Sequence, residues 1–436
     1  MKKSLEIIHP QAAGIDIGSR SFYVDAGEEE VKIFPTYTEG CHQLRDYLKE
    51  RSITTVAMES TGVYWVILYG ILEDAGIEVY LVNGRDVKNV PGRKSDIKDC
   101  QWIRQLHCYG LLKKSFIPQD HIRQLRIYLR LRQDHIRAQA TQAHLMQKAL
   151  TLMNIRLTEV ISDIMGASGS RIIAAILEGE RDTGILVGYC HESILKTKKE
   201  LVIKALEGEY RDEHLFALGH ANQTWHYYQT LIFECDKQVE KLLGEITKDK
   251  EDVSGNKKRK PIRYNKPAVK DLHQSLLKMT EGKDPTGIAG ITDYSFLQIV
   301  GEVGTDMNPW KSEKHFVSWL KLAPMRSSSG NVSRRLSVKR TNKASYLFRS
   351  IAQGILTSKH LALGSFGRRI RARRGSGVAI KAIARKIACY YYRVMTKGEE
   401  FLDKGIAMYE QQQKEQKVKA LQKAAIKLNM NLIPLT

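Results

Sequence analysis

The stretch AGIDIGSRSFYVDAGEEEVKIF, residues 13–34, decides the interpretation of the first hundred residues. It holds three short apolar segments separated by polar, glycine-containing connections of a few residues. Segments of this composition and spacing predict strands over 13–17, 21–26 and 30–34. Because the connections are short, the three strands are expected to form a meander.

Helix and strand patterns alternate after this meander. In chain order the predicted elements are a helix over 40–50, a strand over 54–59, a helix over 63–76, a strand over 77–82 and a helix over 96–112. Three strands followed by alternating helices and strands is the order of a ribonuclease-H-like α/β fold. Residues 1–115 are therefore expected to form one α/β domain of this type.

The composition indicates a polyanionic partner. The chain has 436 residues, and 69 Lys and Arg against 48 Asp and Glu give a formal net charge of +21. Nucleic acid is the commonest partner of so basic a globular chain. Six cysteines without a CxxC pair argue against a zinc knuckle or a disulfide framework. No signal peptide and no run of 18 apolar residues is found, so a cytoplasmic protein is expected.

An apolar heptad repeat marks the middle of the chain. The repeated positions are Ile122, Leu129, Ile136, Ala143, Leu150 and Leu157, with Leu125, Met146 and Met153 at the complementary position. Arg132 and Gln139 interrupt the pattern. Five heptads predict a long antiparallel hairpin or a dimerising coiled coil. A second helix is expected over 225–244 after an irregular segment at 205–219, which makes 116–247 a helical coiled-coil and oligomerisation region.

Residues 248–284 have the composition of a basic linker, since 248–270 is polar and rich in lysine and contains two prolines. The following stretch, PTGIAGITDYSFLQIVGEVG at 285–304, resembles one half of a helix-hairpin-helix, whose turn amides face a phosphate. Only one of the two usual turn glycines is in place. A turn that only packs two helices together is an equal alternative.

The carboxyl-terminal part lacks acidic residues. Between Glu313 and Glu399 no Asp or Glu occurs in 85 residues, whereas 20 Lys or Arg do, including RRIRARR at 368–374. A short basic run is usually a solvated face. A whole region without carboxylates would repel itself unless a polyanion neutralised it. Residues 285–398 are expected to form a mostly α-helical basic domain that lies on nucleic acid, followed by a helical tail at 399–436.

Four acids stand at positions that predict a metal site. Asp16 and Glu59 end predicted strands, and Asp96 and Asp99 lie three residues apart at the start of a predicted helix. In a ribonuclease-H-like order these strand ends and this helix converge at one edge of the sheet. Four carboxylates there require counter-charge, and two Mg²⁺ ions with all-oxygen ligands would supply it.

Each acid also has an ordinary explanation. Asp16 suits a turn before Gly18, Glu59 suits a helix cap, and acids in the first turn of a helix are favoured by its dipole. The Asp-x-Gly turn after a first strand also opens actin-like sugar kinases and ATPases. Those proteins contain a second Asp-x-Gly strand and an adenosine-binding motif further along the chain. This sequence shows neither feature. The combined order and spacing favour the metal site.

The order GIDIGS, AMESTGVYW and VNGRDVKNVPGRKSDIKDCQWI resembles the DEDD transposases of the insertion-sequence-110 family, whose first domain is similar to the junction resolvase RuvC. The stretch from Ile291 to Arg335 resembles that family's second, transposase domain. The resemblance implies a DNA recombinase of a mobile insertion sequence. It assigns metal-binding and catalytic roles to Asp16, Glu59, Asp96 and Asp99, and implies a bacterial or archaeal, nucleoid-associated protein.

The resemblance also implies a serine nucleophile that forms a covalent phosphoserine link to DNA. Ser329, before Gly330, matches best; Ser328 is the alternative and Ser327 is less well placed. Asn331 stands where a second glycine is common, so the serine assignment stays open by one position. Cys100 replaces a common alanine after the last acid. A structured non-coding RNA, the bridge RNA, would pair with donor and target DNA.

Basic residues near the serines and in the arginine-rich run are expected to bind nucleic acid. They are Arg326, Arg334, Arg335, Lys339, Arg340, Arg368, Arg369, Arg371, Arg373 and Arg374. The acids and the serine are expected to act at one composite site, in a homodimer or homotetramer. The alternatives are a RuvC-like metal-dependent nuclease that uses water, and a nucleic-acid-binding scaffold without catalysis.

Overall fold

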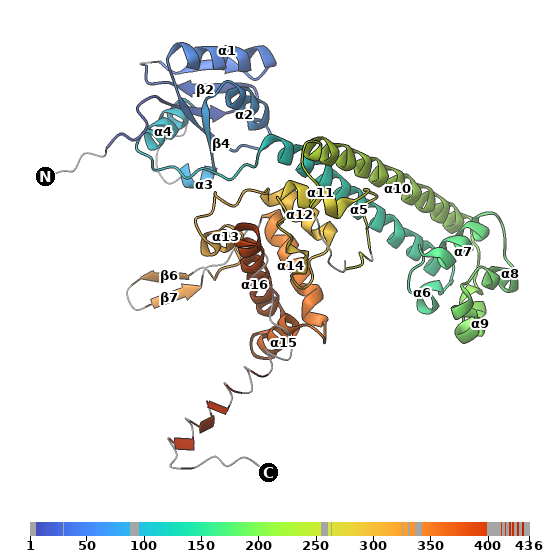
Figure 1. The fold of residues 1–436 in the computed structure, drawn as a ribbon. Coiled ribbons are helices and arrows are strands. Elements are labelled where there is room, and N and C mark those ends of the chain that lie inside the picture. Colours follow the sequence, from blue (N-terminus) through green and yellow to red (C-terminus); the bar gives the residue numbers. More distant parts are fainter. Residues whose placement is uncertain are drawn as a thin grey trace. The chain divides into compact units, whose positions relative to one another are not determined.

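The computed structural model describes residues 6–28, 30–87, 96–253, 260–262, 264–324, 326–329, 332–335 and 342–398, and single residues and pairs between 411 and 430. The chain divides into two compact units, Met1–Ile117 and Pro118–Thr436. Figure 1 shows strands in the first unit and mostly helices in the second.

A mixed five-stranded sheet forms the centre of the first unit. Its strands are β1 (Ala12–Ile17), β2 (Ser21–Asp25), β3 (Lys32–Pro35), β4 (Thr55–Glu59) and β5 (Glu78–Val82). The spatial order is β3-β2-β1-β4-β5, with β1, β2 and β3 antiparallel and with β4 parallel to both β1 and β5. The predicted meander and the predicted α/β order are both confirmed. This sheet is consistent with a ribonuclease-H-like domain.

Helices cover both faces of the sheet. They are α1 (Thr38–Glu50), α2 (Trp65–Asp74), the short α3 (Gly84–Val87) and α4 (Asp96–Cys108). Leu44 of α1 and Leu68 of α2 pack in one core with Ile15 of β1. Ile103 of α4 packs with Ala57 of β4 in a separate core. Because side chains alternate along a strand, Gly14 and Asp16 lie on the opposite face of β1 from Ile15, toward α4.

The second unit is built on an antiparallel pair of long helices. Helices α5 (Asp120–Leu152) and α10 (Asp212–Thr247) run side by side (Figure 1). Arg132 bonds to Asp236, whereas Gln139, seven residues later, bonds to Gln229, seven residues earlier. The two helices therefore run in opposite directions, as in the hairpin that was one of the two predicted arrangements.

The two polar interruptions of the heptad repeat are paired inside this hairpin. Arg132 is 1% exposed, and its Nε donates to Asp236 Oδ1 at 2.6 Å. It also donates to the Tyr294 hydroxyl at 2.8 Å and to the Asn265 carbonyl at 3.1 Å. Gln139 donates from Nε2 to Gln229 Oε1 at 2.9 Å. Buried polar groups need such partners, so these interruptions specify the register of the hairpin.

Two details of the predicted helical region were wrong. The heptad helix was expected to reach Leu157, but α5 ends at Leu152 and Asn154 has a left-handed φ of 57°. Leu157 instead begins α6 (Leu157–Val160) and joins the core of α7 (Ala167–Leu177), α8 (Thr183–Gly188) and α9 (Glu192–Leu206). Much of the segment 205–219, expected to be irregular, belongs to α10. Asp212 and Glu213 in its first turn favour a helix start there.

The range 248–284, predicted as a linker, contains the helix α11 (Leu272–Met279). Lys260, which precedes this helix, is held by hydrogen bonds. The Lys260 ammonium donates to the carbonyl oxygens of Thr286 and Ile288, both at 2.6 Å. These carbonyls belong to the turn η1 (Pro285–Gly287) and the residues before α12 (Asp293–Val303). A Cβ at Gly290, where φ is 81°, would press on Ile355. These contacts support the packing role that was the alternative to a phosphate-binding turn.

The remaining elements form the basic helical part of the chain. They are α13 (Glu313–Trp319), β6 (Arg326–Ser329), β7 (Val332–Arg335), α14 (Lys343–Thr357), α15 (Ala362–Arg374) and α16 (Ser376–Lys397). Phe316, Phe348 and Tyr391 are fully buried at its centre. The prediction of a mostly helical carboxyl-terminal region is confirmed. Within the described part of the chain, no helix has the length and apolar character that crossing a membrane requires.

Candidate functional site

Asp16 and Glu59 lie at the same edge of the sheet. Strands β1 and β4 are parallel neighbours, and Ile15 pairs with Met58. Asp16 and Glu59 are the next residues on each strand, so the register places them beside one another. Both strands end within one residue of these acids. The sequence prediction that these two acids end neighbouring strands is consistent with this geometry.

Gly14 allows α4 to bring two more acids to this edge. A Cβ at Gly14 would overlap with the Cys100 carbonyl and the Arg104 amide, so α4 lies directly on β1 at this point. Asp96 and Asp99 occupy the first turn of α4, just before Cys100. Cys100 is fully buried, and its thiol donates to the Ile97 carbonyl at 3.0 Å. Its small side chain suits this close contact.

The pKa of Asp16 indicates that the four acids lie close together. The pKa of Asp16 is raised from 3.8 to about 6, first by burial and then by Asp96, Asp99 and Glu59. Like charges raise a carboxyl pKa only when they are near, so the other three carboxylates surround Asp16 closely enough to repel its ionised form. Such a shift is typical of functional sites.

A second glycine shapes the site beside Glu59. A Cβ at Gly84, the first residue of α3, would overlap with the Glu59 carboxylate. The Glu59 side chain therefore occupies the space that a side chain at residue 84 would fill. Neither Gly14 nor Gly84 was predicted to matter. The available signal was a glycine two residues before Asp16 and another two residues after the predicted strand 77–82.

The donor set suits a hard divalent cation. Carboxylate oxygens are the ligands that Mg²⁺ prefers, and the pKa of Asp16 is raised by burial and by the three neighbouring acids. Over the residues that the structure describes, no group of three or more His, Cys, Asp or Glu is already arranged around one metal position. The four acids therefore lie close enough to affect one another, but their carboxylates are not arranged around one metal position.

The predicted serine segment forms one strand of a hairpin. In β6 and β7, Arg326 pairs with Arg335, Ser327 with Arg334, and Ser328 with Ser333. Ser329 is the last residue of β6 and pairs with Val332. Gly330 and Asn331, on which the choice of serine depended, lie outside the described residues. The register places all three predicted arginines and the serines on one two-stranded ribbon.

The remaining predicted nucleic-acid contacts fall into three groups. Arg371, Arg373 and Arg374 are exposed at the end of α15. Arg368 and Arg369 are half-buried, and Arg368 donates to the Ser358 carbonyl and to Ser365 Oγ. Arg368 therefore also holds α15 against the preceding loop. Lys339 and Arg340 lie outside the described residues.

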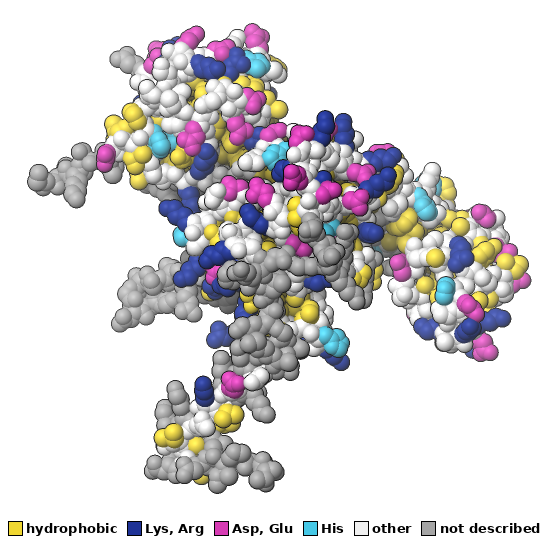
Figure 2. Space-filling view, viewed as in Figure 1, with side chains coloured by type: hydrophobic (Ala, Val, Ile, Leu, Met, Phe, Trp, Pro, Cys, Tyr) yellow, Lys and Arg dark blue, Asp and Glu magenta, His cyan; other side chains and the backbone are white. Residues whose placement is uncertain are grey.

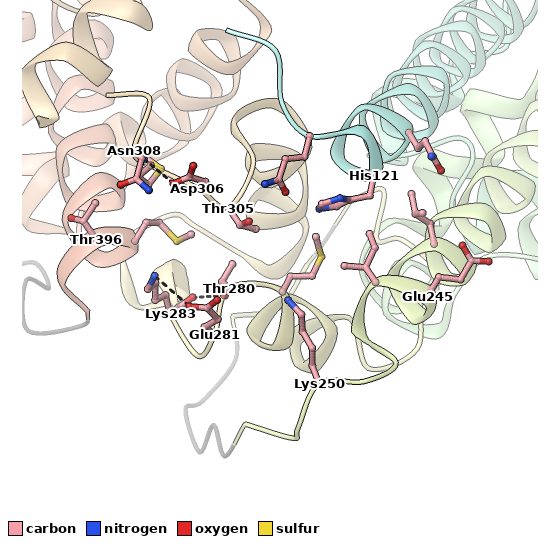
Figure 3. A pocket seen from close by; sticks show the side chains of 17 residues that line it. His121, Glu245, Lys250, Thr280, Glu281, Lys283, Thr305, Asp306, Asn308 and Thr396 are labelled. Carbon is pink, nitrogen blue, oxygen red and sulfur yellow. Dashed lines mark hydrogen bonds and ion pairs between the residues drawn. The ribbon is translucent and has the colours of Figure 1, made fainter. Parts of the chain in front are cut away.

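A large hollow in the second unit has a different character. Its volume is about 940 Å³, and its walls come from the start of α5, the end of α10, the loops after α11 and α12, and the end of α16 (Figure 3). Its walls carry His121, Lys250 and Lys283 together with Glu245, Glu281 and Asp306, and Lys283 pairs with Glu281. Because opposite charges are mixed, this hollow does not favour a polyanion. It was not predicted from the sequence.

Comparison with known protein families covers both parts of the chain. Residues 13–155 match a family model of IS110-type DEDD transposases, described as transposase. Residues 286–360 match a second model, described as transposase of the IS116/IS110/IS902 family. The chain belongs to the IS110 transposase family. A search of curated proteins found no match.

Membership in the IS110 family confirms the resemblance seen in the motifs. The first match contains all four acids, and the second contains the whole β6–β7 hairpin. As a transposase, the IS110 protein is an enzyme of DNA recombination and binds DNA.

Proposed function

We propose that this IS110 transposase cuts and rejoins DNA through a covalent phosphoserine link, assisted by a metal site on Asp16, Glu59, Asp96 and Asp99. The observation that carries the proposal is the raised pKa of Asp16, to which the other three acids contribute. The proposed nucleophile is Ser329, with Ser328 as the alternative. Membership in a transposase family supports DNA as the substrate.

The four acids would hold Mg²⁺, two ions being the natural number for so many carboxylates. Bound Mg²⁺ would supply counter-charge to the acids and stabilise negative charge on the reacting phosphate. The protein's contribution is the gathering of the carboxylates, which depends on the missing side chains at Gly14 and Gly84. Asp16 must lose its proton to act as a ligand, and its pKa of about 6 keeps it mostly ionised at neutral pH.

The serine step conserves the number of phosphoester bonds. A bond forms between the serine Oγ and the phosphorus as the bond from phosphorus to the 3′ oxygen breaks, and the serine proton ends on the free 3′-hydroxyl. Strands can then be rejoined without ATP, because the phosphoserine link retains an ester bond. Arg326, Arg334 and Arg335 lie on the same ribbon as the serine and would offset the charge that develops on the phosphate.

Guidance by a bridge-type RNA and assembly into a dimer or tetramer complete the proposal. A net charge of +21 and 85 residues without an acid fit a protein that holds several polyanionic strands. Duplex positions would then be chosen by base pairing with the RNA, and the protein would supply the chemistry.

The direct test is a search for the protein–DNA adduct. Purified protein is mixed with its element-end DNA, the guide RNA and Mg²⁺, and the strand is labelled on the 3′ side of the cut so that an adduct stays labelled in denaturing gels. The wild type is expected to form the adduct, and Ser329→Ala to lose it by at least a thousandfold. Ser328→Ala is the matched control and is expected to retain it.

Two other outcomes would redirect the assignment. If Ser328→Ala loses the adduct and Ser329→Ala keeps it, Ser328 is the nucleophile. If cutting continues without any adduct in either variant, a water-using nuclease replaces the proposed recombinase. Unchanged activity in Asp16→Asn would contradict the role of the acids in both enzymes.

A further inference from the structure

An exposed apolar segment follows Glu59 in the first unit. Four of its side chains are large, apolar and about half exposed or more: Val63 (75%), Tyr64 (49%), Val66 (46%) and Ile67 (63%). Residues 60–72 contain no Asp, Glu, Lys, Arg or His, so this surface carries no charge of its own. Exposed apolar side chains that gather in one place mark a binding surface more often than scattered ones do.

The turn after β4 is fixed at the sheet edge that carries Glu59. The Ser60 amide donates to the carbonyl of Val82, the last residue of β5, at 2.9 Å. The Thr61 amide donates to the Glu59 carbonyl, also at 2.9 Å. Both bonds tie the turn to the ends of strands. The exposed segment therefore begins at the edge where the four acids gather.

Two neighbouring aromatic residues in this segment have different surroundings. Trp65 is half-buried, packs against the core that contains Leu68, and meets the Tyr69 ring at 5.7 Å between centroids. The Tyr64 ring lies over Gly62, where φ is 53° and a Cβ would come within 3.5 Å of the ring. The Tyr64 side chain makes no hydrogen bond and no contact with another aromatic ring in the described part of the chain. Trp65 therefore anchors α2, whereas Tyr64 is available to a ligand.

A DNA base suits this surface better than a second protein chain does. A stable protein interface uses about 20–30 residues on each side, far more than this segment offers. A single base presents an apolar face of about the size of a tyrosine ring, and an uncharged surface does not repel it. The segment lies within residues 13–155, which match the first transposase model, and a transposase binds DNA.

We propose that Tyr64 stacks on a DNA base near the cut, with Val63 and Ile67 beside it, and so positions the strand at the acid site. The inference rests on the proposed function, since it takes the four acids as the place where the reacting phosphate is held. Apolar side chains that insert at a base step unstack the bases, and an aromatic ring replaces the lost stacking. Tyr64 follows Glu59 by five residues, which span at most roughly 17 Å. The contacted base is therefore expected within about five nucleotides of the cut.

The experiment removes the base and the ring separately and together. Element-end DNA with one abasic site, moved through about five nucleotides on each side of the mapped cut, is titrated with the full-length protein and its guide RNA. Ca²⁺ replaces Mg²⁺, under conditions where no cutting is detected. At one position, the loss of affinity on removing the base is expected to be about tenfold smaller in Tyr64→Ala than in the wild type, because the ring that stacked on the base is already gone.

Tyr64→Phe keeps the ring and is expected to respond to the abasic site as the wild type does. Tyr109→Ala is the matched control, because Tyr109 follows the last residue of α4, at the opposite end of that helix from Asp96 and Asp99. Tyr64→Ala is expected to keep the wild-type denaturant midpoint and Mg²⁺ affinity, since the side chain is exposed. Additive losses at every position, equal behaviour of the Tyr64 Ala and Phe variants, or an equal effect of Tyr109→Ala would overturn the proposal.

The stacking contact and the chemistry can fail separately, because the coupling between Tyr64 and the base is measured without cutting. Ser329→Ala is expected to show the wild-type coupling. An adduct that persists in Ser329→Ala, or cutting that is unchanged in Asp16→Asn, would contradict the proposed function whether or not Tyr64 couples to a base. If both variants lose activity and no base couples to Tyr64, only the stacking contact is wrong. A change in the oligomeric state of Tyr64→Ala without a change in coupling would assign the segment to a protein interface and contradict the proposal.

Discussion

Two clusters of charged side chains in this molecule differ in how their charges are compensated. Inside the second unit, Arg132 is fully buried against Asp236 and satisfied by further oxygens. At the sheet edge of the first unit, four acids gather, and the pKa of Asp16 rises because they repel one another. A buried charge that is paired within the chain holds the fold. Like charges brought close together cost stability and suit a ligand of the opposite charge from outside.

The surface shows the same contrast on a larger scale. On the face of the first unit drawn in Figure 2, acidic and basic side chains are interspersed. At the sheet edge, by contrast, the pKa of Asp16 is raised by three other acids. The four acids therefore stand out from a surface where charges are mixed, and they suit a ligand of the opposite charge.

The largest change in stability is expected when the buried Arg132–Asp236 pair is broken. Asp236→Ala leaves the Arg132 guanidinium buried without its carboxylate and is expected to destabilise the second unit by about 3–5 kcal/mol. Denaturant unfolding monitored by a probe in that unit measures the change. Glu234→Ala, at an exposed position of the same helix, is expected to change stability by less than about 0.5 kcal/mol.

A double variant sharpens that comparison. Replacing both partners, with Arg132→Met and Asp236→Leu, removes the buried charge altogether and is expected to cost less than Asp236→Ala alone. If Asp236→Ala costs no more than the exposed control, the pair does not hold the hairpin, and the contrast with the acid cluster is lost.

Gly14→Ala tests the geometry of the four-acid cluster. The added Cβ overlaps with the Cys100 carbonyl, so α4 must move away from β1. An overpacking cost of about 1–3 kcal/mol is expected, together with weaker Mg²⁺ binding because Asp96 and Asp99 move with α4. Gly70→Ala in α2 is the control. Its Cβ meets no atom within 4 Å, and the change is expected to stabilise the helix by up to about 1 kcal/mol.

The pH dependence of metal binding follows from Asp16. Since its pKa is about 6 without metal, a proton competes with the cation below that pH. The Mg²⁺ affinity is expected to be level above about pH 7 and to fall about tenfold per pH unit below pH 6. Calorimetry in buffers of different ionisation enthalpy would report the released proton. An affinity that stays level from pH 7 to pH 5 would exclude Asp16 as a ligand.

Asp16→Asn is expected to stabilise the metal-free protein slightly. The folded pKa is raised above the unfolded value, so the Asp16 contribution favours the folded state below about pH 4 and is lost as the pH rises to 6. Asp16 is partly exposed, so solvent reduces the effect at pH 7 to about 1 kcal/mol. The gain over wild type should vanish near pH 4. Asp74→Asn, at an exposed site, should show no such pH dependence.

The first unit could be predicted well because its signals are local. Three apolar segments with short connections define the meander, and the strand ends carry Asp16 and Glu59. The closeness of the four acids depends on contacts that no spacing reveals. Gly14 and Gly84 matter because of the atoms above them, which belong to α4 and to the Glu59 side chain.

The second unit was harder for a physical reason. A heptad repeat gives the period of a helix but not its end, and Met153 and Leu157 continued the apolar pattern although they pack in the core of α6–α9. The repeat also cannot identify the partner of Arg132, which lies 104 residues away on α10. A hollow of about 270 Å³ in this unit is lined by side chains from α5, α12 and α14. Only the tertiary fold brings them together.

Calorimetric titration of the full-length protein with Mg²⁺, and with Mn²⁺ as a second probe, tests the central claim most directly. Wild type and the Asp74→Asn control are expected to bind the cations at pH 7.5, whereas Asp16→Asn is expected to lose at least tenfold in affinity. Equal binding by wild type and Asp16→Asn, or no binding by wild type at millimolar metal, would contradict the account that these acids gather to hold a cation.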